Sequence, residues 1–185
     1  MAASRATLTP EQIEAAIRGE RPAVEALTEA FLPRVFGLSL RICRRRELAE
    51  DATQETFVRA LRNLHKLREH GRLKSWLLTI AANTTRELAR KQNRLSPLDY
   101  DPPTIEVEVD EQEAIRQKAL DHALASLAED ERELFLLHTV EGVRLKTLAE
   151  EQQVSVPAMK SRVHRIRSKV RVRALAVLEE AGARA

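Results

Sequence analysis

The sequence predicts an all-α protein of two helical domains joined by an acidic linker. Only five of its 185 residues are glycine, which argues against an all-β protein, and 32% of the residues are charged. This composition, with long stretches in which apolar residues recur at helical spacing, is typical of helical proteins. Aromatic residues make up only 3% of the chain, so each core must be built from leucine, alanine, valine and isoleucine.

The net charge of the chain changes sign twice along the sequence. Residues 1–95 carry 18 basic and 11 acidic side chains, residues 96–133 carry 3 and 12, and residues 134–185 carry 10 and 5. Two basic blocks on either side of an acidic block indicate two modules that face a nucleic acid, joined by a segment that does not.

The first basic block, residues 1–95, shows four helical patterns and forms the first expected domain. The capping box Thr9-Pro10-Glu11-Gln12 starts a short helix that reaches about residue 18. Further helices are expected from about residue 22, where Pro33 should kink or break the helix, from about 47 to 67, and from about 73 to 92.

Residues 96–112 are expected to be a linker. They contain three prolines and six acidic residues, no lysine or arginine, and no helical stripe. Helical patterning returns near residue 113, so residues 113–185 form the second expected domain.

One stretch of the second domain, residues 154–171, is both apolar and basic. Six of its eighteen residues are lysine or arginine and six are large and apolar. On a helix, one narrow stripe collects the apolar residues Val156, Met159, Val163, Ile166 and Val170, and the remaining surface carries Lys160, Ser161, His164, Arg165, Ser168 and Arg171. One face is therefore expected to pack on a core, while the other offers cations and hydrogen-bond donors to a negative partner.

The residues before this stretch favour a helix-turn-helix. A shorter helical pattern, VRLKTLAEEQQ, precedes it, Gln153 stands where such turns usually have glycine, and Ser155 is a good N-cap. In that motif the first half of the second helix enters the major groove of DNA. The residues expected to reach bases or phosphates are Lys160, Ser161, His164 and Arg165. The competing interpretation is an amphipathic helix whose basic face is only solvated.

Two polar strips stand out in the first domain. Asp51, Gln54 and Glu55 share one helical face, opposite apolar residues that include Phe57. On the last helix of the domain, Asn83, Arg86 and Arg90 line up beside an apolar arc of Trp76, Leu77, Ile80 and Leu88, which we interpret as core. Asparagine can both donate to and accept from a base edge, and arginine suits phosphates.

These residues belong to motifs that resemble a known family. In the first domain they are Asp51-x-x-Gln54-Glu55-x-Phe57, then Ser75-Trp76-Leu77-x-x-Ile80-Ala81-x-Asn83, then Arg90. They resemble the second region of bacterial sigma factors, the RNA polymerase sigma subunits, and most closely the extracytoplasmic-function (ECF) class. Residues from Leu124-x-x-Leu127 through Glu131-Arg132 to Lys160-Ser161-Arg162-x-His164-Arg165-x-Arg167 resemble the fourth region. The resemblance covers about residues 20–95 and 113–173.

The resemblance implies partners and residue roles. Core RNA polymerase, through its β and β′ subunits, promoter DNA and an anti-sigma factor are the implied partners. Polymerase binding would fall to Asp51, Gln54 and Glu55. At the −10 element, Asn83 would meet a flipped base, and phosphates would be held by Arg86, Arg90, Lys91 and Arg94. The −35 element would be read by Lys160, Ser161, His164 and Arg165, with Arg162, Arg167 and Arg171 on phosphates.

Three other functions compete with this interpretation. An enzyme is disfavoured because the histidines and Cys43 are scattered, without the spacing of a metal site or a catalytic triad, and no cofactor is implied. A dimeric helix-turn-helix repressor or activator would not account for the motifs between Asp51 and Arg94. A sigma mimic that only binds a regulator would not need the cations that face DNA.

The expected compartment is the cytoplasm. A single cysteine excludes an internal disulfide and suggests a reducing environment. The sequence has no apolar run near 18 residues and no basic-then-apolar leader, so neither membrane insertion nor export is expected.

Overall fold

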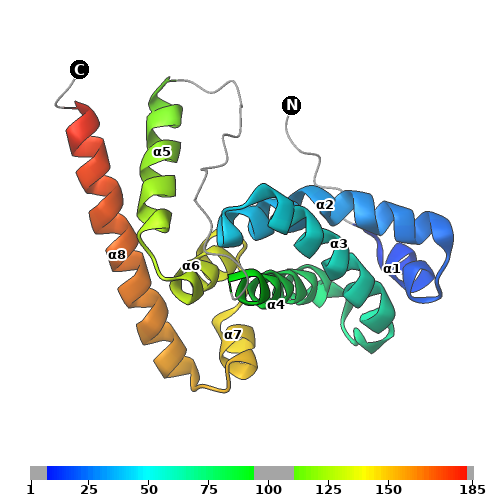
Figure 1. Ribbon diagram of the computed structural model, residues 1–185. Helices are drawn as coiled ribbons and strands as arrows, with labels where there is room; N and C mark the ends of the chain where they lie inside the picture. The colour runs from blue at the N-terminus through cyan, green and yellow to red at the C-terminus, as the bar shows by residue number, and fades with distance from the viewer. Residues whose placement is uncertain (1–7, 94–110, 183–185) are drawn as a thin grey trace. The chain divides into compact units, whose positions relative to one another are not determined.

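The computed structural model describes residues 8–93 and 111–182, and the chain separates into two compact units, residues 1–103 and 104–185 (Figure 1). Every regular element in the described ranges is helical, which confirms the expected all-α class. Residues 96–110 of the expected linker lie outside the described residues. The last two residues of the expected linker, 111 and 112, are helical, because the first helix of the second unit begins at Glu111.

The first unit is a bundle of three long helices with a short one at its edge. It comprises α1 (Pro10–Ile17), α2 (Arg21–Cys43), α3 (Arg46–Asn63) and α4 (Leu73–Asn93), with short 3-10 turns at Leu64–Lys66 and His70–Arg72. The helices α2, α3 and α4 all pack on one another, and α1 packs on α2 (Figure 1).

Two local signals in the first unit have different outcomes. The capping box of α1 forms as expected: Thr9 Oγ1 accepts from the Gln12 amide at 3.3 Å, and Gln12 Oε1 accepts from the Thr9 amide at 2.9 Å. Of the kink or break expected at Pro33, a break does not occur, since α2 continues through this residue. Pro33 is exposed, while Leu27 and Val35 on the buried side hold both halves of the helix in the core.

The buried face of α4 differs from the expected apolar arc. Leu77 is fully buried, but Trp76, Ile80 and Leu88 are only half-buried. Trp76 therefore lies at the edge of the core rather than in its centre. The buried face of α4 combines leucines with small residues: Leu73, Leu77, Leu78, Ala81, Ala82, Thr84, Thr85 and Ala89.

The second unit consists of shorter helices followed by one long helix. Its elements are α5 (Glu111–Ala125), α6 (Glu129–Phe135), a π-type turn at Leu136–Val140, α7 (Leu145–Glu151) and α8 (Val156–Gly182). The helix α5 packs along α8 (Figure 1). Arg132 closes the end of α5 by donating to the carbonyls of Leu124 at 2.9 Å and Leu127 at 3.0 Å.

The apolar stripe of α8 packs as expected, with one exception. Met159, Val163, Ile166 and Val170 are buried, but Val156 is 43% exposed. Val156 is the first residue of the helix, so the packed stripe starts one turn later, at Met159.

The turn between α7 and α8 has the expected helix-turn-helix features. Gln153 adopts a φ of 54°, the left-handed conformation that usually calls for glycine. The amide of Val154 donates to the Ala149 carbonyl at 3.0 Å, and Ser155 Oγ caps α8 by accepting from the Ala158 amide at 3.3 Å. Sequence and backbone geometry thus agree on where the chain turns.

Substitutions at Gln153 test this geometry. We expect Gln153→Val to lower the free energy of unfolding by about 1–3 kcal/mol, because a β-branched residue is strained at positive φ. The control, Gln153→Gly, should change it by less than about 1 kcal/mol. Urea unfolding followed by circular dichroism measures both, and equal stability of the two variants would contradict the left-handed turn.

Candidate functional site

The polar strip of α3 faces outward, as the sequence predicts. Asp51 and Gln54 are exposed and Glu55 is half-buried. The opposite side of the helix buries Ala52, Thr53, Thr56, Phe57 and Ala60 in the core of the first unit. Burial of that side fixes the rotation of α3, so the three polar groups are presented together.

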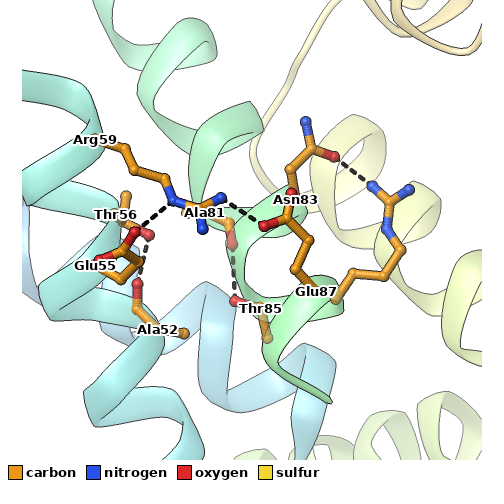
Figure 2. Close-up of polar contacts among 9 residues, drawn as sticks. Ala52, Glu55, Thr56, Arg59, Ala81, Asn83, Thr85 and Glu87 are labelled. Carbon is orange, nitrogen blue, oxygen red and sulfur yellow. Dashed lines mark hydrogen bonds and ion pairs between the residues drawn. The ribbon is translucent and has the colours of Figure 1, made fainter. Parts of the chain in front are cut away.

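An arginine connects this strip with α4 (Figure 2). Arg59 Nε donates to Glu55 Oε1 at 2.7 Å, and Arg59 Nη1 donates to Glu87 Oε2 at 2.6 Å. The hydrogen bonds to these two carboxylates raise the pKa of Arg59 above its ordinary value, and the bond to Glu55 has the larger effect. Glu55 is therefore part of a bridge between two helices. Sequence analysis missed that bridge, because Glu87 lies 28 residues beyond Arg59 and only the spacing of Glu55 and Arg59 gives a local signal.

The strip on α4 combines an amide with several cations. Asn83 and Arg86 are half-buried, and the Arg86 guanidinium donates to Asn83 Oδ1 (Figure 2). One turn further on, Arg90 and Lys91 are exposed. Arg94 lies outside the described residues. The contact with Arg86 holds the Asn83 amide in one orientation, a feature that the sequence pattern did not indicate.

A buried pair of hydroxyls attaches this part of α4 to α2. Thr85 Oγ1 lies 2.7 Å from the Ala81 carbonyl oxygen and 3.0 Å from Ser39 Oγ, and both side chains are fully buried. Because Thr85 directly precedes Arg86 and is itself fully buried, the bond to Ser39 helps to fix the direction in which the strip points.

The outer face of α8 carries the residues predicted to read DNA. Lys160, Ser161, His164 and Arg165 are exposed and together line an open depression on that face. Arg167 and Arg171 are exposed as well. The structure thus brings these six predicted residues onto the side of α8 that does not pack on the core.

Arg162, the seventh predicted residue on α8, is engaged inside the unit. Its Nη1 donates to Gln152 Oε1 at 2.8 Å, and its Nη2 is paired with Asp130 on α6. A second ion pair joins the same helices, with Lys169 Nζ 2.6 Å from Glu131 Oε1. Both pairs escaped the sequence analysis, since their partners lie 32 and 38 residues apart.

The described part of the chain meets the requirements of neither a metal site nor a membrane-spanning helix. Within it, no group of three or more histidine, cysteine, aspartate or glutamate side chains is placed to hold a metal ion. None of the helices in residues 8–93 and 111–182 has both the length and the apolar character needed to span a membrane.

Comparison with known proteins agrees with the two-unit architecture. Residues 27–95 match the family described as Sigma-70 region 2, and residues 117–170 match Sigma-70, region 4. The RNA polymerase sigma factor CarQ of Myxococcus xanthus is 34% identical over 157 residues, which cover 83% of this chain and 90% of CarQ. The chain belongs to the ECF sigma factor family. The family predicted from the sequence motifs is thereby confirmed.

Two further comparisons, one with a sequence relative and one with a solved structure, agree with this family and fold. The ECF RNA polymerase sigma factor SigE of Mycolicibacterium smegmatis is 29% identical over 157 residues, covering 81% of this chain and 61% of SigE. Among solved structures, the sigma factor RpoE of Bartonella quintana, in complex with the anti-sigma factor NepR, has a TM-score of 0.62 at 23% identity. The match covers 80% of this chain and 94% of RpoE, so the two proteins share a fold.

The hydroxyl pair that orients α4 can be tested by a double-mutant cycle. Thr85→Val is expected to lower the free energy of unfolding by about 1–3 kcal/mol, because the buried Ser39 hydroxyl loses its partner. The control Thr85→Ser keeps the hydroxyl that bonds to Ser39, although it removes the methyl group, so it shows what the variant costs when the bond remains. The double variant Ser39→Ala with Thr85→Val should recover part of the loss, since neither buried group is then unpaired. Purely additive losses in thermal unfolding would argue against this bond.

Proposed function

We propose that this ECF sigma factor directs core RNA polymerase to specific promoters, recognises their −35 and −10 elements and promotes melting of the DNA. The observation that carries the proposal is the outer face of α8, where exposed cationic and hydrogen-bonding side chains stand opposite a buried apolar stripe. The match of residues 27–95 to Sigma-70 region 2, within the first basic block of the chain, supports the proposal further. The chemistry of RNA synthesis belongs to the polymerase, so the proposed role is regulatory. The proposed compartment is the cytoplasm.

In the proposed −35 complex, residues of α8 divide into two groups. Lys160, Ser161, His164 and Arg165 lie in the first three turns of the helix and reach base edges in the major groove. Arg167 and Arg171 follow on the exposed side and contact phosphates, which adds affinity but little sequence preference.

The proposed −10 contact is made by the strip on α4. The Asn83 amide offers both a donor and an acceptor to an unstacked base. Arg86, Arg90 and Lys91 provide positive charge for the neighbouring phosphates, and Arg94 continues the same sequence strip. Support comes from their arrangement, since Asn83 is held in place by Arg86 and the two following cations are exposed.

The proposed polymerase surface is the strip of Asp51, Gln54 and Glu55 on α3, which would contact the β′ subunit, with the β subunit as a further partner. Exposure of Asp51 and Gln54 supports this assignment. An anti-sigma factor is a further proposed partner, because the structurally similar RpoE of Bartonella quintana was solved in complex with one.

Charge reversal at Asp51 tests the polymerase surface. Asp51 is preferable to Glu55, since reversal of Glu55 would also break its ion pair with Arg59. Asp51→Lys should alter folding by no more than about 0.5 kcal/mol, as most surface substitutions do. It should weaken binding to core polymerase by about tenfold or more, which corresponds to a contact above about 1 kcal/mol.

The matched control is Glu14→Lys, the same charge change at an exposed position of α1. Titration of labelled protein with core polymerase measures the affinity of both variants. Equal affinities for Asp51→Lys, Glu14→Lys and the wild type would mean that the α3 strip is only a solvated surface.

Alanine substitutions on α8 test the reading of the −35 element. Lys160→Ala and Arg165→Ala are each expected to reduce discrimination between −35 variants by about 1–3 kcal/mol, the range for a base-edge contact. Arg167→Ala and Arg171→Ala should weaken all sequences alike and lower the salt dependence by roughly one unit of slope each.

Arg173→Ala serves as the control, because Arg173 is an exposed cation of the same helix, eight residues beyond Arg165. Run-off transcription with core polymerase on a promoter library measures preference. Wild-type preference in the Lys160, His164 and Arg165 alanine variants alike would show that the basic face of α8 does not read DNA.

A further inference from the structure

Arg162 of α8 contacts both α6 and the turn of the helix-turn-helix. Its guanidinium reaches Asp130 in the first turn of α6 and Gln152 at the end of α7. Arg162 is half-buried, with 35% of its side chain exposed, whereas Lys160, Ser161 and Arg165 are exposed. The fork of an arginine suits such a double contact, because its nitrogens point in fixed directions.

The two partners of Arg162 have different roles in the motif. Gln152 is the C-cap of α7 and directly precedes Gln153, the residue with the left-handed backbone. Asp130 belongs to α6, outside the helix-turn-helix itself. By holding both, Arg162 ties the second turn of α8 to the turn before it and to the neighbouring helix. Rotation or tilt of α8 at its DNA-reading end would break one contact or the other.

We propose that Arg162 is a positioning residue that sets the angle of α8 for base reading, and that it is not a contact to DNA phosphates. This inference rests on the proposed function of α8 in −35 recognition. Base-edge hydrogen bonds need narrow distances and angles, whereas attraction to phosphates tolerates displacement. Loss of the Arg162 contacts therefore costs discrimination between sequences more than it costs overall affinity.

The second ion pair between α6 and α8 provides an internal comparison. Lys169 lies two helical turns beyond Arg162 on α8 and pairs with Glu131. Within the described residues, it has no hydrogen bond or ion pair with the segment between α7 and α8. Lys169→Ala removes the same charge and one α6–α8 ion pair, as Arg162→Ala does, but leaves the contact to Gln152 in place. A purely stabilising role of the ion pairs would make the two substitutions equivalent.

Asp130→Asn separates positioning from phosphate binding. It weakens the anchor on α6 while every cation of α8 remains. If Arg162 held a phosphate, release from Asp130 would leave DNA binding unchanged or strengthen it. If Arg162 positions α8, Asp130→Asn reproduces the loss of discrimination caused by Arg162→Ala.

The experiment uses the full chain bound to core polymerase and a promoter selected from a library by the wild-type protein. Discrimination between the selected −35 element and single-base variants is measured for wild type, Arg162→Ala, Asp130→Asn, Lys169→Ala and Arg165→Ala. The salt dependence of promoter binding is measured alongside. Circular dichroism at the assay temperature selects conditions under which all five proteins are folded.

If Arg162 positions α8, Arg162→Ala and Asp130→Asn should each lose about tenfold in discrimination between −35 sequences, which is within the range for one base contact. The salt dependence of promoter binding should stay unchanged in both variants. Lys169→Ala should keep wild-type discrimination. The inference is overturned if Asp130→Asn discriminates like the wild type, if Arg162→Ala lowers the salt slope by about one unit for all sequences, or if Lys169→Ala behaves like Arg162→Ala.

Failure of the proposed function would look different. A wild-type protein that selects no −35 sequence, or an Arg165→Ala variant with full wild-type preference, would count against base reading by α8 as a whole. A discriminating wild type with an impaired Arg165→Ala variant, combined with unaffected Asp130→Asn and Arg162→Ala variants, would remove only the positioning role.

Discussion

Burial of the apolar stripe on α8 is the interaction on which the proposed DNA surface depends. Met159, Val163, Ile166 and Val170 lie against the rest of the second unit, and this packing fixes the rotation of the helix about its axis. The polar residues between them in the sequence must then face outward. Specific side chains can read a base edge only if this rotation is fixed, so the core and the recognition surface are two results of one sequence pattern.

Much of this architecture could be predicted, because its signals are local. Helical periodicity, the Thr9 capping box and the Ser155 cap each depend on residues within a few positions of one another. The left-handed turn at Gln153 was placed by the motif around it. Trp76 shows the limit of this reasoning, since periodicity identifies an apolar arc but cannot tell which of its residues are fully buried and which lie at the edge of the core.

The contacts that the sequence did not reveal are ion pairs between distant residues. Arg59 with Glu87, Arg162 with Asp130, and Lys169 with Glu131 each join separate helices. Their consequence is electrostatic as well as geometric. A count of basic residues overstates the charge available to DNA, because some cations of each basic block are already compensated within the fold. Exposure and partners, taken together, identify the cations that remain on the surface.

The length of α8 adds a mechanical consequence. Its 27 residues span about 40 Å at 1.5 Å per residue, whereas the major groove is about 12 Å wide. In the proposed complex only the first turns of α8 would enter the groove, while the later turns pack along α5 and leave Val172 and Leu175 exposed. A force applied to this far end of the helix would then tilt the end proposed to read the bases, with the ion pairs to α6 as the pivot.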